Sequence, residues 1–104
     1  MKRGEIWWAD QKEPIGRRPV LLLSRDESYK VRNAVIVAQI TTIIRNIPTE
    51  VYLDTQDDMP KKCVINCDDI GTIRKHSLTE RITTLKSEKI EQMEQAIKFA
   101  LALK

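Results

Sequence analysis

Arg18-Pro19-Val20-Leu21-Leu22-Leu23-Ser24 is the stretch that decides the fold, because its apolar residues follow one another without alternation. Pro19 cannot donate a hydrogen bond to a neighbouring strand, so it marks the start of a strand or the edge of a sheet. A polar, charged loop at 26–33 separates this stretch from a second apolar run, Ala34-Val35-Ile36-Val37-Ala38-Gln39-Ile40. Runs of this length and composition predict two β-strands.

Both predicted strands are apolar on their two faces, whereas an antiparallel sheet usually leaves one face to water. A closed barrel, a C-terminal helix or another subunit would each cover the second face. The pattern is therefore a first indication of dimerisation, and a helix packed across one face of a small barrel is the alternative that it leaves open.

Shorter segments complete the predicted sheet. Pro14 and Gly16 place a loop at 10–16, and the polar residues Asp68-Asp69-Ile70-Gly71 predict a turn or a single helical turn. The remaining β-type segments lie at 6–9, 50–53, 63–67, 72–73 and 81–85.

The safest secondary-structure prediction is a helix from Ser87, as its N-cap, to about Leu103. Apolar residues recur there at spacings of three and four, and Glu94 and Lys98 form an i,i+4 pair on the exposed side. The apolar stripe consists of Ile90, Met93, Ile97, Ala100 and Leu101. The chain is thus expected to be one domain, residues 1–104, in which a small curved β-sheet precedes one helix.

The size and charge of the chain limit the kind of site that it can build. A domain of 104 residues has room for one modest core, so a site is expected in a shallow groove or at a subunit interface. The formal net charge is +3, with the basic excess in residues 1–49, which suits a polyanionic partner. Because no apolar stretch is long enough for a secretory signal peptide or a membrane span, we expect a cytoplasmic protein.

Cys63 and Cys67 are the only cysteines. On one strand they would lie about 13 Å apart at ~3.3 Å per residue, too far to form a disulfide with each other. His76 and Asp68 are nearby, but the spacing matches no standard zinc motif. Both thiols are expected to be reduced and buried, and we expect neither a metal nor a cofactor.

The chemistry that the residues support is narrow. His76 is the only histidine, and the sequence contains no Ser-His-Asp arrangement and no glycine-rich phosphate loop. Arginine and threonine at strand ends suit RNA cleavage by transesterification, in which the substrate's own 2′-hydroxyl attacks the adjacent phosphate. Arginine's planar, permanently charged fork fits a phosphate, and the 2′-hydroxyl separates RNA from DNA.

The sequence resembles the MazF/PemK (plasmid maintenance toxin) family of mRNA interferases, which belong to type II toxin–antitoxin systems. The resemblance extends over nearly the whole chain, because blocks that are weak alone occur in the family's order and spacing. These blocks are Lys2-Arg3-Gly4-Glu5-Ile6-Trp7, Arg18-Pro19-Val20-Leu21-Leu22, Val37-Ala38-Gln39-Ile40-Thr41, Cys63-Val64-Ile65-Asn66-Cys67-Asp68, Thr72-Ile73 and Leu78-Thr79-Glu80-Arg81-Ile82.

The resemblance implies a mainly β, SH3-like (CcdB/PemK-like) barrel of about five to seven antiparallel strands with a C-terminal helix. It also implies a homodimer with RNA grooves at the subunit interface and a cognate antitoxin protein that blocks them. Arg18 matches the main catalytic arginine, which contacts the scissile phosphate and donates a proton. Thr41 matches a threonine that hydrogen-bonds a phosphate oxygen in the transition state.

Two departures from the family pattern affect recognition. The link from Gln11 to Gly16 is short and lacks the Gly-x-Glu-Gln-like segment and the histidine that relatives often carry. Asn66 stands where some relatives have an arginine, and Asp68 matches an acidic position. Asp68 either accepts the 2′-hydroxyl proton or caps the following turn.

Other residues are candidates for substrate binding. Arg17 is either a second phosphate contact or a solvated neighbour, and only one of Thr41 and Thr42 can point into a groove because neighbouring strand residues alternate. Trp7 and Trp8 also point to opposite faces. One of them is expected in the core, and the other would stack on a base or meet a partner subunit. Lys61-Lys62 is either solvated surface or a contact for the RNA backbone.

Three functions remain open from the sequence. The first is a sequence-selective, metal-independent endoribonuclease that leaves 2′,3′-cyclic phosphate and 5′-hydroxyl ends on single-stranded mRNA. The second is a CcdB-like toxin that poisons a topoisomerase without cutting RNA, and the third is a noncatalytic RNA-binding barrel. In the first case, the loops at 11–16, 26–33 and 54–62 would determine which sequence is cut.

Overall fold

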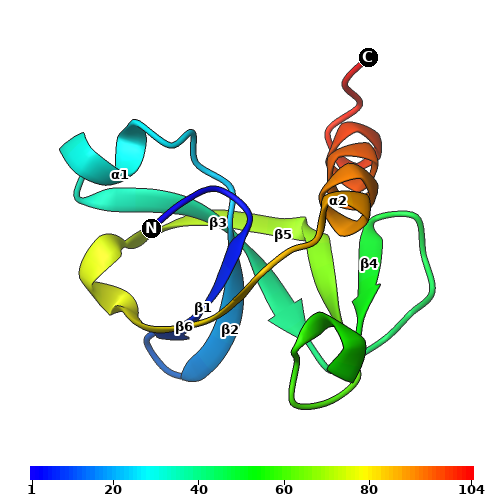
Figure 1. Cartoon of the computed structure of the whole chain (residues 1–104), viewed down its shortest axis with the longest axis horizontal. Helices are drawn as coiled ribbons and strands as arrows, with labels where there is room; N and C mark the ends of the chain where they lie inside the picture. Colours follow the sequence, from blue (N-terminus) through cyan, green and yellow to red (C-terminus); the bar gives the residue numbers. More distant parts are fainter.

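The computed structural model describes all residues, 1–104, as one antiparallel sheet of six strands with a long helix after the last strand. The strands are β1 (Glu5–Asp10), β2 (Arg17–Leu22), β3 (Ala34–Thr41), β4 (Glu50–Leu53), β5 (Cys63–Arg74) and β6 (Leu78–Thr84). Their order in the sheet is β4-β5-β3-β2-β1-β6, and the sheet curls into a half-barrel (Figure 1). The predicted mainly β fold with a C-terminal helix is confirmed.

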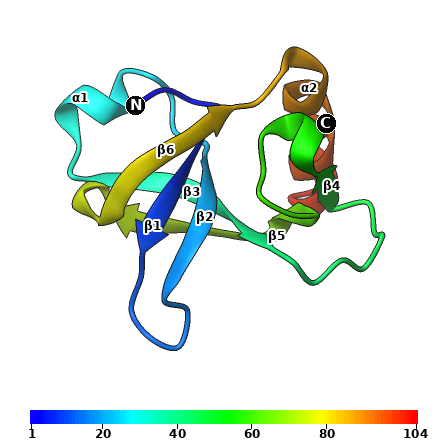
Figure 2. The same ribbon diagram turned by 60° about the horizontal axis from the view of Figure 1, so that its bottom comes forward.

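The apolar strands β2 and β3 bury both faces within a single chain. Leu21, Ala38 and Ile40 belong to one core cluster, whereas Val20 and Val37 belong to a second one on the other face. Helix α2 (Ser87–Ala100) covers the first cluster. The curl of the sheet, together with helix α1 (Ser28–Val31), covers the second. Figures 1 and 2 show α1 and α2 at opposite ends of the curled sheet, α1 near β3 and α2 near β4. The two-sided apolar pattern is therefore satisfied without a second subunit.

Strand β5 differs most from the prediction. Residues 68–71 form no separate turn, because β5 runs on through them to Arg74 and absorbs the segment predicted at 72–73. The register jumps instead: Gln39 pairs with Asn66, but its neighbour Ala38 pairs with Ile70. Three residues of β5, 67–69, thus bulge out of the ladder, which bends the strand there.

Helix α2 begins one residue earlier and ends earlier than expected. Lys86 is the N-cap and makes no side-chain capping bond, so Ser87 is the first helical residue and not the cap. Met93 is fully buried, and Ile90, Ile97 and Ala100 pack against the same core, as the predicted stripe requires. Leu101 lies beyond the helix and is exposed, because the regular helix stops at Ala100.

Smaller differences concern the connections. The loop predicted at 26–33 contains α1, and two short 3-10 turns, Thr55–Asp57 and Lys75–Ser77, join the later strands. Strand β6 starts at Leu78, before the predicted 81–85. Cys63 and Cys67 are free and buried, as predicted. No helix has the length and apolar character needed to cross a membrane.

Candidate active site

Arg18 and Thr41 meet where β2 and β3 diverge. The ladder between the two strands ends at the pair Val20 and Gln39, and the antiparallel register continued by two residues sets Arg18 opposite Thr41. The Arg18 side chain is exposed and makes no hydrogen bond or ion pair within the chain. The Thr41 hydroxyl oxygen accepts a bond from the Ile43 backbone N–H at 3.2 Å, which leaves its own proton free to be donated. The two residues that the sequence singles out are thus brought together.

Two depressions share Arg18, Thr41 and Ile43 as lining residues. Arg18 and Thr41 therefore lie on a rim between the two depressions. The depression that we call the Asn66 depression has a volume of about 190 Å³. Its other lining residues are Ile15, Gln39, Arg45, Asn66 and Asp69. Gln39 and Asn66 are register partners on β3 and β5, and they point to the same face as Arg18. This side of the rim therefore offers polar groups.

The second depression, the Trp8 depression, lies on the other side of the rim and has a volume of about 330 Å³. Pro19 and Trp8 are register partners on β2 and β1, so they share one face of the sheet. The lining residues besides the shared three are Trp8, Arg17, Pro19, Ile40, Thr42, Met59, Pro60, Lys61 and Cys63. This side is predominantly apolar.

The structure decides between the two tryptophans. Trp7 packs against the second core cluster, and its indole N–H donates to Glu5 Oε1 at 2.9 Å. Trp8 lines the depression beside Arg18 and is half-buried. Trp7 is therefore the tryptophan that packs against the core, although it is only partly buried, and Trp8 is the one that lines the depression.

Arg17 is fixed by several neighbours and is not a freely solvated residue. Its guanidinium carbon lies 4.8 Å from the centroid of the Trp8 ring. One nitrogen, Nη1, donates to Thr79 Oγ1 at 2.8 Å and lies 3.5 Å from Asp10 Oδ1. The other, Nη2, lies 3.8 Å from Glu80 Oε2. Arg17 and Arg18 thus differ, because only Arg18 is free of partners.

The acidic bulge of β5 separates Asp68 from Asp69. Asp68 Oδ2 accepts a hydrogen bond from Thr49 Oγ1 at 2.6 Å, and Asp68 lines neither depression. It caps no turn, because the chain continues as strand. Asp69 lines the Asn66 depression instead. The bulge could not be predicted from the sequence, and it places the carboxylate of Asp69, not that of Asp68, at the Asn66 depression.

Sequence reasoning missed three polar residues of the Asn66 depression, which are Asp69, Gln39 and Arg45. Gln39 lies inside an apolar strand, where a single amide is the available signal of a polar pocket. Arg45 lies on the β3–β4 connection, whose backbone is held by Glu50. Glu50 Oε1 accepts hydrogen bonds from the Arg45 N–H at 2.8 Å and the Asn46 N–H at 3.0 Å. His76 is exposed on the turn before β6 and lines neither depression.

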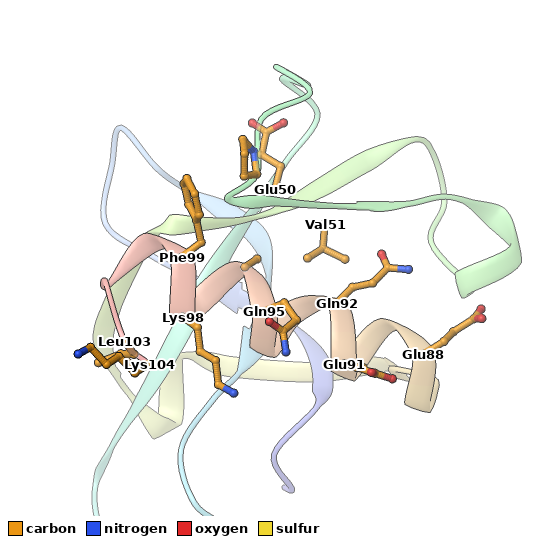
Figure 3. A pocket seen from close by; sticks show the side chains of 12 residues that line it. Glu50, Val51, Glu88, Glu91, Gln92, Gln95, Lys98, Phe99, Leu103 and Lys104 are labelled. Atoms are coloured by element: carbon orange, nitrogen blue, oxygen red, sulfur yellow. The ribbon is translucent and has the colours of Figure 1, made fainter.

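A hollow larger than both depressions lies elsewhere, between α2 and β4, and we call it the α2 groove. It is open, with a volume of about 950 Å³ (Figure 3). Glu88 and Glu91 lie toward one end of α2, and Lys98 and Lys104 toward the other. Phe99, with 64% of its surface exposed, also lines the groove. These side chains suit protein association better than they suit catalysis.

Residues 2–101 match the family described as PemK-like, MazF-like toxin of type II toxin-antitoxin system. The chain belongs to this family. Among its relatives, the probable endoribonuclease MazF5 of Mycobacterium tuberculosis is 34% identical over 100 residues, covering 95% of this chain and 91% of the relative. Endoribonuclease EndoA of Bacillus subtilis is 33% identical, covering 99% and 96%.

Solved structures of MazF-like proteins have the same fold. The Mycobacterium tuberculosis toxin MazF-mt6 superposes with a TM-score of 0.88 at 31% identity, covering 96% of this chain and 98% of the toxin. A mycobacterial endoribonuclease in complex with its cognate antitoxin gives a TM-score of 0.88 at 26% identity, covering 100% and 97%. The resemblance stated from the sequence is confirmed, and with it the MazF-like fold.

Proposed function

We propose that this MazF-like chain is a sequence-selective, metal-independent endoribonuclease that cuts single-stranded mRNA. The observation that carries the proposal is the partnerless Arg18, set opposite the Thr41 hydroxyl on a rim between two depressions. Curated relatives that match nearly the whole chain are named endoribonucleases, which supports this reaction. A single-stranded RNA can lay its phosphate on the rim and a base on either side.

The reaction uses a nucleophile that the substrate supplies. The 2′-oxygen attacks the adjacent phosphorus, the bond to the 5′-oxygen breaks, and the products are a 2′,3′-cyclic phosphate and a 5′-hydroxyl. Arg18 holds the phosphate and neutralises its growing negative charge, while the Thr41 hydroxyl donates to a phosphate oxygen. Arg18 also delivers the proton to the leaving oxygen. Charge stabilisation by arginine needs no metal ion.

The 2′-hydroxyl proton requires an acceptor. Asp68 matches the family's acidic position, but its carboxylate is engaged by Thr49 outside both depressions. Asp69 lines the Asn66 depression together with Arg18 and Thr41. We therefore assign to Asp69 the role of accepting the 2′-hydroxyl proton. Asn66 and Thr42 are assigned as contacts for the flanking nucleotides.

A second copy of the chain completes the enzyme in this proposal. Acidic residues lie at the start of α2 and basic residues at its end, so two antiparallel copies would pair opposite charges across the α2 groove. Phe99 would be covered at this contact. The β3–β4 connection borders both hollows, because its Pro48 lines the α2 groove and its Arg45 lines the Asn66 depression. A second copy bound at the α2 groove would therefore lie near the Asn66 depression, and the two copies together would form one longer RNA groove.

A cognate antitoxin is the second protein partner. The complex of a mycobacterial relative contains such a partner, and a flexible segment that folds on binding suits an open groove. We place both encounters in the cytoplasm, where mRNA is available.

The deciding experiment incubates the purified protein with single-stranded RNA and with matched DNA in the presence of a chelator. We expect cleavage of RNA only, with cyclic phosphate ends, and a loss of about 10²–10³-fold in rate for Arg18→Ala. Intact RNA at high protein concentration would overturn the proposal. RNA binding without cleavage would favour the noncatalytic barrel, and inhibition of a topoisomerase by intact protein would favour the CcdB-like toxin.

Two further measurements test the finer assignments. Asp69→Asn should lower the cleavage rate, whereas Asp68→Asn should change stability more than rate; the reverse result assigns the proton to Asp68. Phe99→Glu should convert a dimer into a monomer in sedimentation equilibrium. A wild-type monomer at the concentration at which RNA is cut would contradict the dimer.

A further inference from the structure

We propose that the Trp8 depression is a nucleobase subsite and that Arg17 is its stacking platform. The inference rests on the proposed function, because it needs an RNA phosphate at Arg18. It gives Arg17 a role different from that of its neighbour. Arg18 takes the phosphate, and Arg17 presents the flat face of its guanidinium to the adjoining base.

The first argument is that the edge of the Arg17 guanidinium is already used. Nη1 donates to Thr79 and faces Asp10, while Nη2 faces Glu80. A phosphate binds to this edge, where the N–H groups point. A base binds to the plane of the group instead, and bases stack readily on arginine planes.

The second argument concerns charge. Two carboxylates, those of Asp10 and Glu80, surround the single positive charge of Arg17. A phosphate brought to Arg17 would meet both negative groups at short range, which is unfavourable. An uncharged base meets no such repulsion. The cluster is therefore suited to a base and poorly suited to a phosphate.

The third argument is rigidity. The guanidinium carbon lies over the Trp8 ring, 4.8 Å from its centroid, and contacts on β1 and β6 hold the group in place. Arg17 still has 46% of its side chain exposed, so solvent, and hence a base, can reach it. Ordering a free arginine on binding costs conformational entropy, and a preordered platform avoids that cost.

The size and lining of the depression agree with this occupant. Its volume of about 330 Å³ is at the small end of the range for small-molecule sites. Pro19, Met59 and Pro60 add apolar walls. Arg18 and Thr41 stand at its border, so a base in the depression would belong to a nucleotide next to the cleaved bond.

The test is a double-substitution cycle between Arg17 and the base. After wild-type protein has identified the cleaved bond, binding is measured to RNA that is blocked by a 2′-O-methyl group at that bond. One set of RNAs is intact, and two others lack the base on the 5′ or the 3′ side. Arg17→Lys keeps the charge but removes the plane, and Arg81→Lys on β6, outside both depressions, is the matched control.

We expect Arg17→Lys to weaken binding of the intact RNA by about tenfold or more, as for loss of one stacked base. The same substitution should have little effect on one of the two abasic RNAs, and Arg81→Lys should change neither. Equal losses on all RNAs would show that Arg17 contacts phosphate and would overturn the inference. If wild-type protein cuts no RNA, the proposed function fails instead. Unchanged thermal unfolding of Arg17→Lys would confirm that the fold is intact.

Discussion

Gln11 and Gln39 exchange two side-chain hydrogen bonds, so the β1–β2 connection is tied to the middle of the sheet. Gln39 Nε2 donates to Gln11 Oε1 at 2.7 Å, and Gln11 Nε2 donates to Gln39 Oε1 at 3.2 Å. Gln39 also lines the Asn66 depression beside Arg18. The connection between β1 and β2, drawn in blue in Figure 2, is thus tied to β3 beside the Asn66 depression.

This amide pair predicts a measurable coupling. Gln11→Ala and Gln39→Ala should each destabilise the fold, and the double variant should cost less than their sum by about 0.5–1.5 kcal/mol, because either single change already breaks both bonds. Urea unfolding of the four proteins measures the coupling. Strict additivity would show that the two amides do not stabilise each other in solution.

Gly4 and Gly71 form a matched pair for a test of the backbone. Gly4 has φ +93°, and an added Cβ would lie 2.8 Å from Ile90 Cδ1. We expect Gly4→Ala to destabilise the protein by about 1–3 kcal/mol through backbone strain, since the tip of Ile90 can move. Gly71→Ala meets no atom within 4 Å and should be neutral or slightly stabilising. Equal melting temperatures for the two variants would contradict this reading.

Lys61 and Lys62 should differ in their contribution to RNA binding. Only Lys61 lines the Trp8 depression. Binding of uncleavable RNA to Lys61→Gln should therefore depend less steeply on salt, by about 0.7 in the log–log slope expected for one contact with a single strand. Lys62→Gln should keep the wild-type slope. The same change in both variants would mean that the strand passes over the whole 54–62 segment.

The buried thiols predict a loss of stability at high pH. Burial raises the pKa of the Cys63 and Cys67 thiols from 9.0 to about 11, with nearby aspartates adding to the effect. Between these values the folded protein keeps protons that the unfolded chain has lost. The thiol contribution to stability is thus complete below about pH 9 and disappears as the pH rises through about 11.

Urea unfolding from pH 8 to pH 11 measures this dependence. The double variant Cys63→Ala/Cys67→Ala should lose less stability over the interval than the wild type, although it is less stable at pH 8 because of the cavities. Parallel curves for the two proteins would show that the thiols contribute nothing and that Tyr29, whose pKa burial raises to about 12, carries the effect.

Local sequence patterns predicted the parts of this fold that depend on neighbouring residues. The sequence predicted β2, β3 and α2 because burial determines where their apolar residues fall. These residues form continuous runs in the two strands and a stripe around Met93 in the helix. The continuation of β5 past Asp68 escaped prediction, since only pairing with β3 keeps such a polar segment extended. Long-range pairing overrode local preference there.

The site divides in the same way. Arg18 and Thr41 were predicted from the family resemblance, and the ladder between β2 and β3 brings them together. Gln39, Arg45 and Asp69 were missed because their placement depends on the bulge in β5 and on the β3–β4 connection. The contacts that hold Arg17 join residues of β1, β2 and β6, and the spacing of these residues along the chain does not predict that they meet.

Glu50 gives the protein a connection between distant surfaces. Its side chain is only 3% exposed, and its carboxylate fixes the backbone of Arg45 and Asn46. One end of this connection borders the α2 groove and the other borders the depression beside Arg18. A protein that binds at α2 and shifts Glu50 would therefore change the affinity of this chain for RNA without contacting the RNA. By thermodynamic reciprocity, bound RNA would alter affinity for that protein by the same factor.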